Sequence, residues 1–153
     1  MEAKETLLRD AAAMESIIMR LVWLERKRFA QELATCGLTV PQFLTLTHIE
    51  RLGSPCPMGE LAAQMHQSSA TMTGIIERLV KMGLVARQSS PHDRRLVLVG
   101  LTEAGRATLE QAHRARRERM CGSLARMGEG DRREFIRLLR AYLAASEAGE
   151  QGP

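Results

Sequence analysis

Aromatic residues are scarce in this chain of 153 residues, which contains one Trp, one Tyr and three Phe. Aliphatic and methionine side chains must therefore form most of the core. Such side chains suit packed helices better than a β-sandwich, whose strands favour aromatic and β-branched residues. The composition thus favours a mainly helical fold.

Cysteine is also rare, and its positions exclude one class of protein. Cys36, Cys56 and Cys121 are widely spaced and form no CxxC pair. An odd number without a pairing pattern argues against a secreted disulfide framework. The four histidines are scattered without the spacing of zinc ligands. We therefore expect no metal site and no cofactor.

Long apolar runs are missing as well. No stretch approaches the roughly 18 apolar residues that cross a bilayer. The charged start, residues 1–5, lacks the apolar segment of a signal peptide. We therefore expect a cytoplasmic protein with no membrane partner. No nucleophile–base pairing and no phosphate-binding glycine loop is evident, so we do not expect an enzyme.

What the chain does have is a series of amphipathic helices. Apolar residues recur at three- and four-residue spacing over residues 6–33, which predicts one long helix closed by Gly37. Thr39, with Gln three residues later, predicts a capping box for a helix over residues 42–52 that stops at Gly53.

The net charge of +4 permits a nucleic-acid partner without requiring one.

The middle of the chain predicts a helix-turn-helix followed by a hairpin. A short helix over residues 58–65 precedes Ser68, a good N-cap for a helix that runs to residue 82. The periodicity then changes to that of two strands, residues 84–88 and 95–99, around a polar loop. Thr102 begins a long helix to about residue 127, and a last helix covers about residues 131–145.

These elements predict a mainly α (α+β) fold, a winged helix-turn-helix with a two-stranded β-hairpin wing. The DNA-binding domain covers residues 41–101, and the helical dimerisation regions cover residues 1–40 and 102–147. Residues 148–153 have the composition of a disordered tail. The small central domain cannot cover the apolar stripes of the outer helices, so a second copy is the simplest cover and predicts a homodimer.

The segment Ser68–Arg106, SSATMTGIIERLVKMGLVARQSSPHDRRLVLVGLTEAGR, resembles the MarR family of transcription regulators. The helix start, the exit KMGLV, the tip Asp93-Arg94-Arg95 and the following LTEAG all match in order. The resemblance implies a homodimer on a pseudo-palindromic double-stranded DNA operator, acting as a repressor. It also implies a small phenolic or anionic effector, with cysteine oxidation or metal binding as alternatives that it does not decide.

One face of the helix over residues 68–82 carries Met72, Ile75, Ile76 and Leu79, which we expect to pack on the core. The rest of the helix supplies the expected DNA contacts, with its N-terminal end in the major groove. These candidates are Ser68, Ser69, Ala70, Thr71, Thr73, Gly74 and Arg78. Gly74 stands where family members often carry a long basic side chain, so we expect specificity to depend on DNA shape and on the wing.

The wing completes the expected DNA contacts. By resemblance, Arg95 reaches the minor groove, Asp93 orients it through an ion pair, and Arg94 contacts phosphate. A turn of this composition is also common as a solvated loop, and a Ser/Thr-rich helix start is commonly only a cap. The joint order of the two features favours the DNA-binding interpretation.

For an effector, the family places ligands where the first helix, the second helix and the connecting helix meet. Trp23, Arg26 and His48 are the candidates for stacking, for pairing a carboxylate and for hydrogen bonding. Trp23 also fits a place in the dimer core. Sensing by a cysteine early in the first helix is not expected, because that helix has no cysteine before its end and the only tyrosine is Tyr142.

A second class of function stays open at this point. A winged helix can also serve as a protein-interaction module that has lost its affinity for DNA. Arg78, Arg94 and Arg95 favour DNA binding, since such a module need not keep them. Gly74 and the low polarity of the recognition helix favour the second interpretation.

Overall fold

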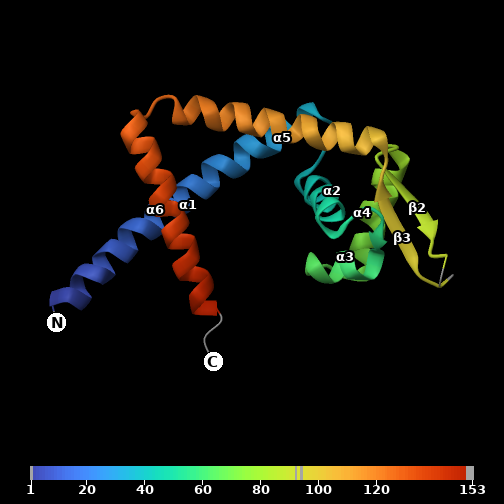
Figure 1. Cartoon of the computed structure of the whole chain (residues 1–153), viewed down its shortest axis with the longest axis horizontal. Helices are drawn as coiled ribbons and strands as arrows, with labels where there is room; N and C mark the ends of the chain where they lie inside the picture. Colours follow the sequence, from blue (N-terminus) through green and yellow to red (C-terminus); the bar gives the residue numbers. More distant parts are fainter. Residues whose placement is uncertain (1, 92, 94, 151–153) are drawn as a thin grey trace. The chain divides into compact units, whose positions relative to one another are not determined.

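The structure is a computed structural model that describes residues 2–91, 93 and 95–150. The chain divides into two compact units, Met1–Arg114 and Ala115–Pro153, with the boundary inside helix α5 (Glu103–Leu124). The helices of the first unit are α1 (Glu2–Thr35), α2 (Val40–Leu52), α3 (Met58–Gln64) and α4 (Ser69–Lys81) (Figure 1). The second unit contains α6 (Glu129–Glu150).

The ends of α1 and α2 follow the predicted capping signals. Gly37 has a φ of 70°, and the Leu38 N–H donates to the Leu33 carbonyl (2.9 Å), which closes α1. Thr39 and Gln42 form the expected capping box. The Thr39 N–H donates to Gln42 Oε1 (2.8 Å), and the Gln42 N–H donates to Thr39 Oγ1 (3.5 Å). Two backbone N–H groups at this helix start are thereby satisfied.

One hydrophobic core holds the first unit together. Its fully buried members come from α1, α2, α3, α4, α5 and the segments around Cys56 and Val99, and they include Leu33, Leu46, Leu61, Met72, Ile76, Val99 and Leu109. Phe43 extends this core through edge-to-face contacts with Phe29 and His113, each with ring centroids 5.1 Å apart. The core fixes α4 and the hairpin that follows it in one body, so both can meet a ligand together.

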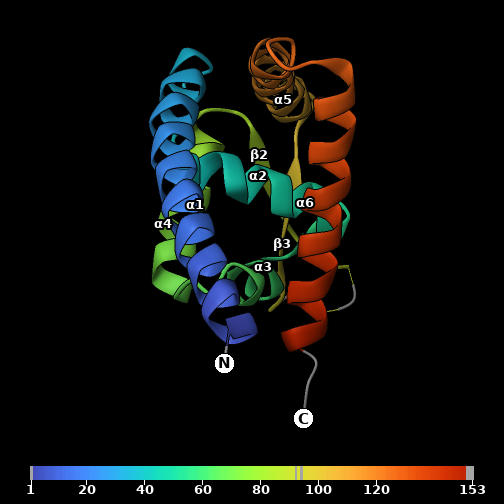
Figure 2. The same ribbon diagram turned by 90° about the vertical axis from the view of Figure 1, so that its left-hand side faces the viewer.

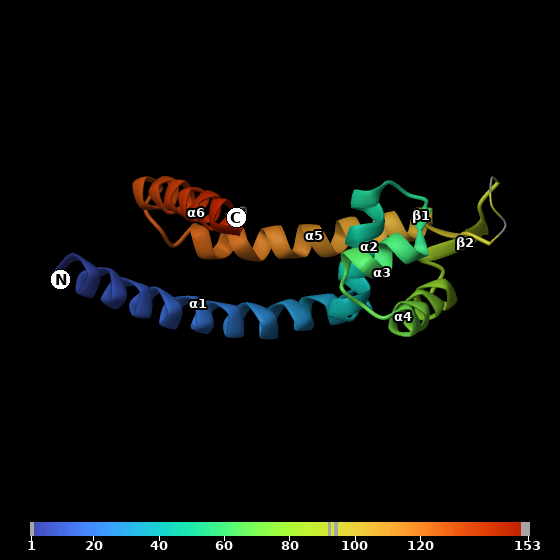
Figure 3. The ribbon, with the colours of Figure 1, turned by 90° about the horizontal axis from the view of Figure 1, so that it is seen from below.

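The sheet has three strands, in the order β1–β3–β2. Strands β2 (Val85–Ser89) and β3 (Val97–Leu101) form the predicted hairpin, with Arg87 opposite Val99, and the hairpin extends beyond the short helices (Figure 3). The third strand, β1 (Cys56–Pro57), pairs with β3 through Cys56 and Val99 and was not expected. The wing sheet is thus three-stranded, because this two-residue segment pairs with a strand far along the chain.

The start of α5 is packed directly on the backbone that leaves α4. Thr102 caps the helix as expected, since its hydroxyl accepts the Gly105 N–H (3.0 Å), and it also donates to the Gly83 carbonyl (2.7 Å). The Thr102 N–H donates to the Leu84 carbonyl (3.1 Å). A Cβ on Gly105 would lie 2.0 Å from that carbonyl oxygen. Only glycine permits this close approach.

Helices α1 and α6 each carry an apolar face that the described residues of their own unit leave exposed. Both are drawn as continuous helices in Figure 2. On α1, Leu7, Ile17 and Trp23 are 69%, 68% and 64% exposed. On α6, Leu139 and Leu143 are 55% and 57% exposed. Faces of this kind mark sites of association.

Several boundaries differ from those predicted. Helix α5 ends at Leu124, earlier than expected, and α6 begins at Glu129 and runs to Glu150. Residues 148–150, expected to belong to a disordered tail, are therefore helical, while residues 151–153 lie outside the described part. None of the helices in the described part is long and apolar enough to cross a membrane.

Candidate nucleic-acid interface

The start of α4 is shaped by a local cap. The Ser68 hydroxyl accepts the Thr71 N–H (3.1 Å) and lies 2.8 Å from the Thr71 hydroxyl. This satisfies one of the N–H groups that a helix start leaves without an intrahelical partner. The two hydroxyls are therefore engaged with each other, and the remaining backbone N–H groups of this first turn are the donors available to an anion.

The turn between α3 and α4 sets the angle of the second helix. His66 adopts a φ of 50°, and its N–H donates to the Ala63 carbonyl (3.1 Å). The Gln67 N–H donates to the Ala62 carbonyl (3.0 Å). These bonds satisfy the end of α3 within the turn and bring the chain round to Ser68. The result is the expected helix-turn-helix.

The two faces of α4 are separated as the sequence predicts. Met72, Ile76 and Leu79 are fully buried, and Ile75 packs at the edge of the core. The expected contact residues lie on the accessible side: Ser68, Ser69, Ala70, Thr71 and Arg78 are exposed, and Thr73 and Gly74 are half-buried. A helix held by one face and open on the other fits a major groove.

In the wing, Asp93 makes a different contact from the expected one. Its carboxylate accepts the backbone N–H of Arg95 (2.9 Å), so the contact seen is a backbone bond and not the expected ion pair. The Leu96 N–H donates to the Asp93 carbonyl (3.0 Å), which tightens the turn further. Asp93 therefore fixes the backbone that presents the exposed Arg95 side chain. Arg94 lies outside the described residues.

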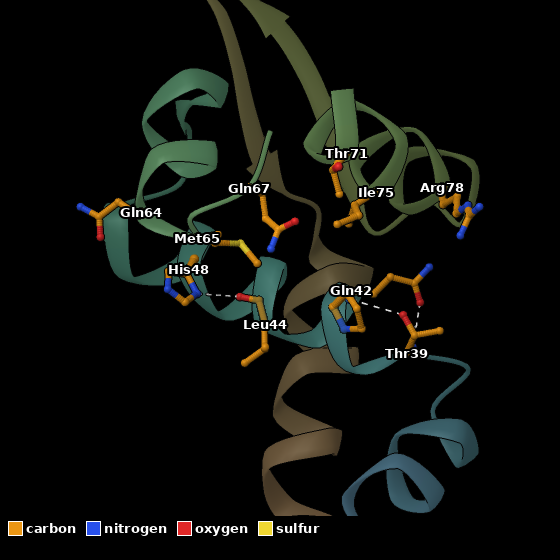
Figure 4. Close-up of a pocket in the computed structure, with 11 residues that line it drawn as sticks. Thr39, Gln42, Leu44, His48, Gln64, Met65, Gln67, Thr71, Ile75 and Arg78 are labelled. Atoms are coloured by element: carbon orange, nitrogen blue, oxygen red, sulfur yellow. Dashed lines mark hydrogen bonds between the residues drawn. The ribbon is translucent and has the colours of Figure 1, made fainter. Parts of the chain in front are cut away.

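A cavity of about 500 Å³ lies between α2, α3 and α4 (Figure 4). Its walls include Gln42, Leu44 and His48 from α2, and Thr71 and Arg78 from α4. The His48 ring Nδ1 lies 2.9 Å from the Leu44 carbonyl oxygen, which orients the ring. The cavity is large enough for a small aromatic molecule. The cavity lies against α4, the helix with the expected DNA contacts. Of its lining residues, the sequence named only His48, Thr71 and Arg78 as candidate site residues.

The three residues expected to share an effector site do not line one cavity. Trp23 and Arg26 line a separate hollow on α1, together with Lys27 and Ala30. The Lys27 ammonium lies 5.9 Å from the centroid of the Trp23 ring, a weak cation–π contact. Of the three candidates, only His48, on α2, lines the cavity beside α4.

The Cys56 thiol lies in surroundings that disfavour its thiolate form. Burial raises the pKa of the Cys56 thiol, and the negative charge of Glu60 raises it further. A raised pKa leaves little reactive thiolate. Cys36 is half-buried and Cys121 is exposed. Within the described residues, no group of three or more His, Cys, Asp or Glu side chains could hold a metal ion.

Gly74 offers a direct test of how open the α4 surface is. A Cβ at this position would meet no atom within 4 Å. Gly74→Ala is therefore expected to stabilise the fold by about 0.5–1 kcal/mol, because alanine favours the helix and meets no obstacle. Urea denaturation measures this change. A loss of stability would show that the site is less open than the structure indicates.

An accessible, capped helix packed beside a three-stranded wing is the architecture of winged helix-turn-helix proteins that bind nucleic acid. The profile of the MarR family matches residues 38–97. The HTH-type transcriptional repressor NicR of Pseudomonas putida is 34% identical over 119 residues, which cover 78% of this chain and 75% of NicR.

Solved structures of related proteins have the same fold. A MarR family protein from Bacillus stearothermophilus has a TM-score of 0.81 at 25% identity, covering 91% of this chain and 96% of that one. A mutant of S. aureus MepR bound to an oligodeoxyribonucleotide has a TM-score of 0.68 at 20% identity, covering 86% and 96%. The chain belongs to the MarR family of transcriptional regulators. It is thus a regulator and not an enzyme, as the sequence predicts.

Proposed function

We propose that this protein is a homodimeric, sequence-specific repressor that binds a pseudo-palindromic double-stranded DNA operator and releases it when a small anionic or phenolic effector binds. The observation that carries the proposal is the accessible face of α4 held in one compact unit with the wing. Repression follows the name of NicR, the relative that is 34% identical. The MepR structure with an oligodeoxyribonucleotide supports DNA as the partner of this fold.

On DNA, the first turns of α4 enter the major groove. Ser69, Ala70 and Thr73 supply small contacts, such as a hydroxyl to a base edge or a methyl beside thymine. Gly74 adds no side chain, so direct readout by this helix is modest. Backbone N–H groups at the start of α4 and the exposed Arg78 hold phosphates.

The wing supplies the second part of the recognition. Arg95 enters the minor groove, where a narrow A·T-rich segment concentrates negative potential. The Asp93 carboxylate holds the Arg95 backbone N–H and so keeps the turn in shape before DNA arrives. Arg94, by resemblance, contacts phosphate. An Arg95 backbone that is held in this way loses less conformational freedom on binding.

The dimer forms through α1 and α6. Each helix exposes an apolar face that the described residues of its own unit leave open, and a second copy of the same helices covers it. Two winged helices are then held at a fixed separation. Fixed separation is what a pseudo-palindromic operator needs, because each half-site is read by one copy.

The effector binds in the cavity beside α4. His48 and Gln42 offer hydrogen bonds, Leu44 and Ile75 offer apolar walls, and Arg78 offers a charge for a carboxylate or phenolate. A ligand on Arg78 draws this side chain from phosphate. The cavity and the DNA surface share α4, so occupancy of one alters the other. Trp23 and Arg26 belong, in this proposal, to the dimer-facing side of α1.

A salt titration tests the proposal as a whole. The protein is mixed with labelled DNA from upstream of its own coding region and with a random duplex, and anisotropy is recorded over a range of salt concentrations. We expect tighter binding to the upstream DNA and a steep fall of affinity with salt on both. Equal affinity for the two duplexes over the whole range would contradict sequence-specific binding there.

Arg95→Ala tests the wing. We expect operator binding to weaken by about 1–3 kcal/mol, because the minor groove loses its inserted guanidinium. The fold should be unaffected, since the side chain is exposed. Leu96→Ala, at the neighbouring exposed position, serves as the control. Unchanged affinity of Arg95→Ala in the same anisotropy assay would remove the wing from the mechanism.

Leu44→Trp tests the effector cavity. Leu44 is 40% exposed on the cavity wall, so a larger ring there fills space without entering the core. We expect benzoate and phenol probes to release the operator from the unaltered protein and to fail with Leu44→Trp. Leu44→Met is the control, because it keeps the volume nearly unchanged. Equal release from all three proteins would place the effector elsewhere.

A further inference from the structure

Arg87 is a residue of the wing that touches the recognition helix. It lies on β2, where Val85 is buried and the following residues are exposed. Its guanidinium Nη2 donates to the Thr73 carbonyl oxygen in α4 (3.4 Å). One side chain therefore spans from the second strand to the helix that enters the major groove.

The guanidinium keeps its binding capacity in this position. Arginine carries five N–H donors in a planar fork and stays charged at any physiological pH. The contact with Thr73 uses a neutral backbone carbonyl, so it does not cancel the positive charge. It does hold the long side chain in place, which lowers the entropy that is lost when an anion binds. Arg87 is thus an exposed and partly ordered cation.

The place of Arg87 between the two elements indicates what it faces on DNA. The major and minor grooves are separated by a phosphodiester strand. A protein that places a helix in one groove and a wing in the next must lay the intervening residues over that strand. Arg87 bridges the helix and the wing strand, so a duplex bound in this way would run its phosphates past Arg87.

We propose that Arg87 is a phosphate-binding residue that holds the DNA strand between the groove read by α4 and the groove read by the wing. This inference rests on the proposed DNA-binding function. Gly74 assists it, because the position next to Thr73 has no side chain and no neighbouring atom within 4 Å of a Cβ. The duplex can approach this stretch of the helix closely.

The variants Arg87→Gln and Arg87→Lys separate the charge from the contact with Thr73. Glutamine can still donate a hydrogen bond but carries no charge, whereas lysine keeps the charge. Arg133→Gln is the control, because Arg133 is an exposed arginine on α6 with a side chain that is 79% exposed. Each protein is titrated against the upstream DNA and a random duplex at several salt concentrations, and its thermal melt is recorded.

For Arg87→Gln we expect binding to weaken about ten-fold on both duplexes. The slope of log affinity against log salt should fall by about one for each Arg87 that contacts phosphate. Arg87→Lys should keep the slope of the unaltered protein, and Arg133→Gln should change nothing. Equal losses on both duplexes are expected because phosphate contacts carry no sequence information.

Two results would overturn the inference while leaving the proposed function standing. One is an unchanged salt slope for Arg87→Gln, and the other is a loss confined to the upstream DNA, which would indicate a base contact. If Arg87→Gln melts at a lower temperature than the unaltered protein, the result for Arg87→Lys decides whether Arg87 contacts phosphate. Lysine keeps the charge, so a reduced salt slope in Arg87→Lys would contradict a phosphate contact. An unaltered protein that binds neither duplex would overturn the proposed function and this inference together.

Discussion

Leu139→Glu is expected to convert the protein to a monomer and to lower operator affinity by at least about 100-fold. Leu139 is 55% exposed on α6, in the apolar face that the proposed dimer buries. A carboxylate without a partner costs several kcal/mol in such an interface, and the two-fold axis introduces it twice. Losing the link between two half-site contacts accounts for the large fall in affinity.

Light scattering after size-exclusion chromatography measures the mass, and anisotropy measures the affinity. Ala141→Glu is the matched control, because it adds the same carboxylate on nearly the opposite side of α6. The control should remain a dimer with normal affinity. A dimeric Leu139→Glu that binds DNA normally would contradict the role given to this face.

Gly105→Ala is expected to destabilise the DNA-binding unit by about 2–3 kcal/mol, a cost typical of overpacking. The added Cβ would lie 2.0 Å from the Leu84 carbonyl oxygen, so α5 must move away from the backbone that leads into β2. The bonds of Thr102 to Gly83 and Leu84 would be strained in the process. We also expect weaker DNA binding, because the wing begins at this junction.

Urea denaturation compares Gly105→Ala with Gly122→Ala in the same helix. A Cβ on Gly122 meets no atom within 4 Å, so this control should gain about 0.5–1 kcal/mol through helix propensity. Opposite signs for the two variants are the expected result. Similar gains in stability would show that α5 does not pack on Leu84 as described.

The helix caps were predictable because their signals are local. Thr39 with Gln42, and Ser68 before its helix, satisfy backbone groups within four residues. The apolar stripe of α4 was predictable for the same reason, because helical periodicity alone decides which face can reach the core. Each of these features needs no knowledge of the rest of the fold.

Features that depend on distant parts of the chain were not predictable in this way. Strand β1 consists of Cys56 and Pro57, and only pairing with Val99 and Leu98 makes it a strand. The hairpin strands lie one or two residues further along than predicted, because register comes from pairing across the sheet. The contact of Arg87 with Thr73 joins two elements whose spacing appears only in the fold.

The candidate sites also differ in whether they depend on local sequence or on contacts between distant parts of the chain. The candidate DNA contacts of α4 follow from periodicity and from the resemblance to the MarR family. The cavity combines side chains from segments far apart in the chain, so the sequence named His48 as an effector candidate and Thr71 and Arg78 as DNA contacts without placing them in one cavity. Trp23 and His48 were expected together because the family resemblance gives one meeting point for the first two helices, and in this chain the two residues line separate hollows.

A footprint on the DNA upstream of the coding region tests the central claim most directly, namely that two winged helices of one dimer read one operator. The account predicts two protected half-sites with centres about 10 base pairs apart, related by a pseudo-two-fold axis. It also predicts that Arg95→Ala weakens protection at both half-sites equally. Protection of a single half-site would contradict the dimer. Uniform, sequence-blind protection would contradict a specific operator there, and no protection at all would instead favour a winged helix that serves as a protein-interaction module.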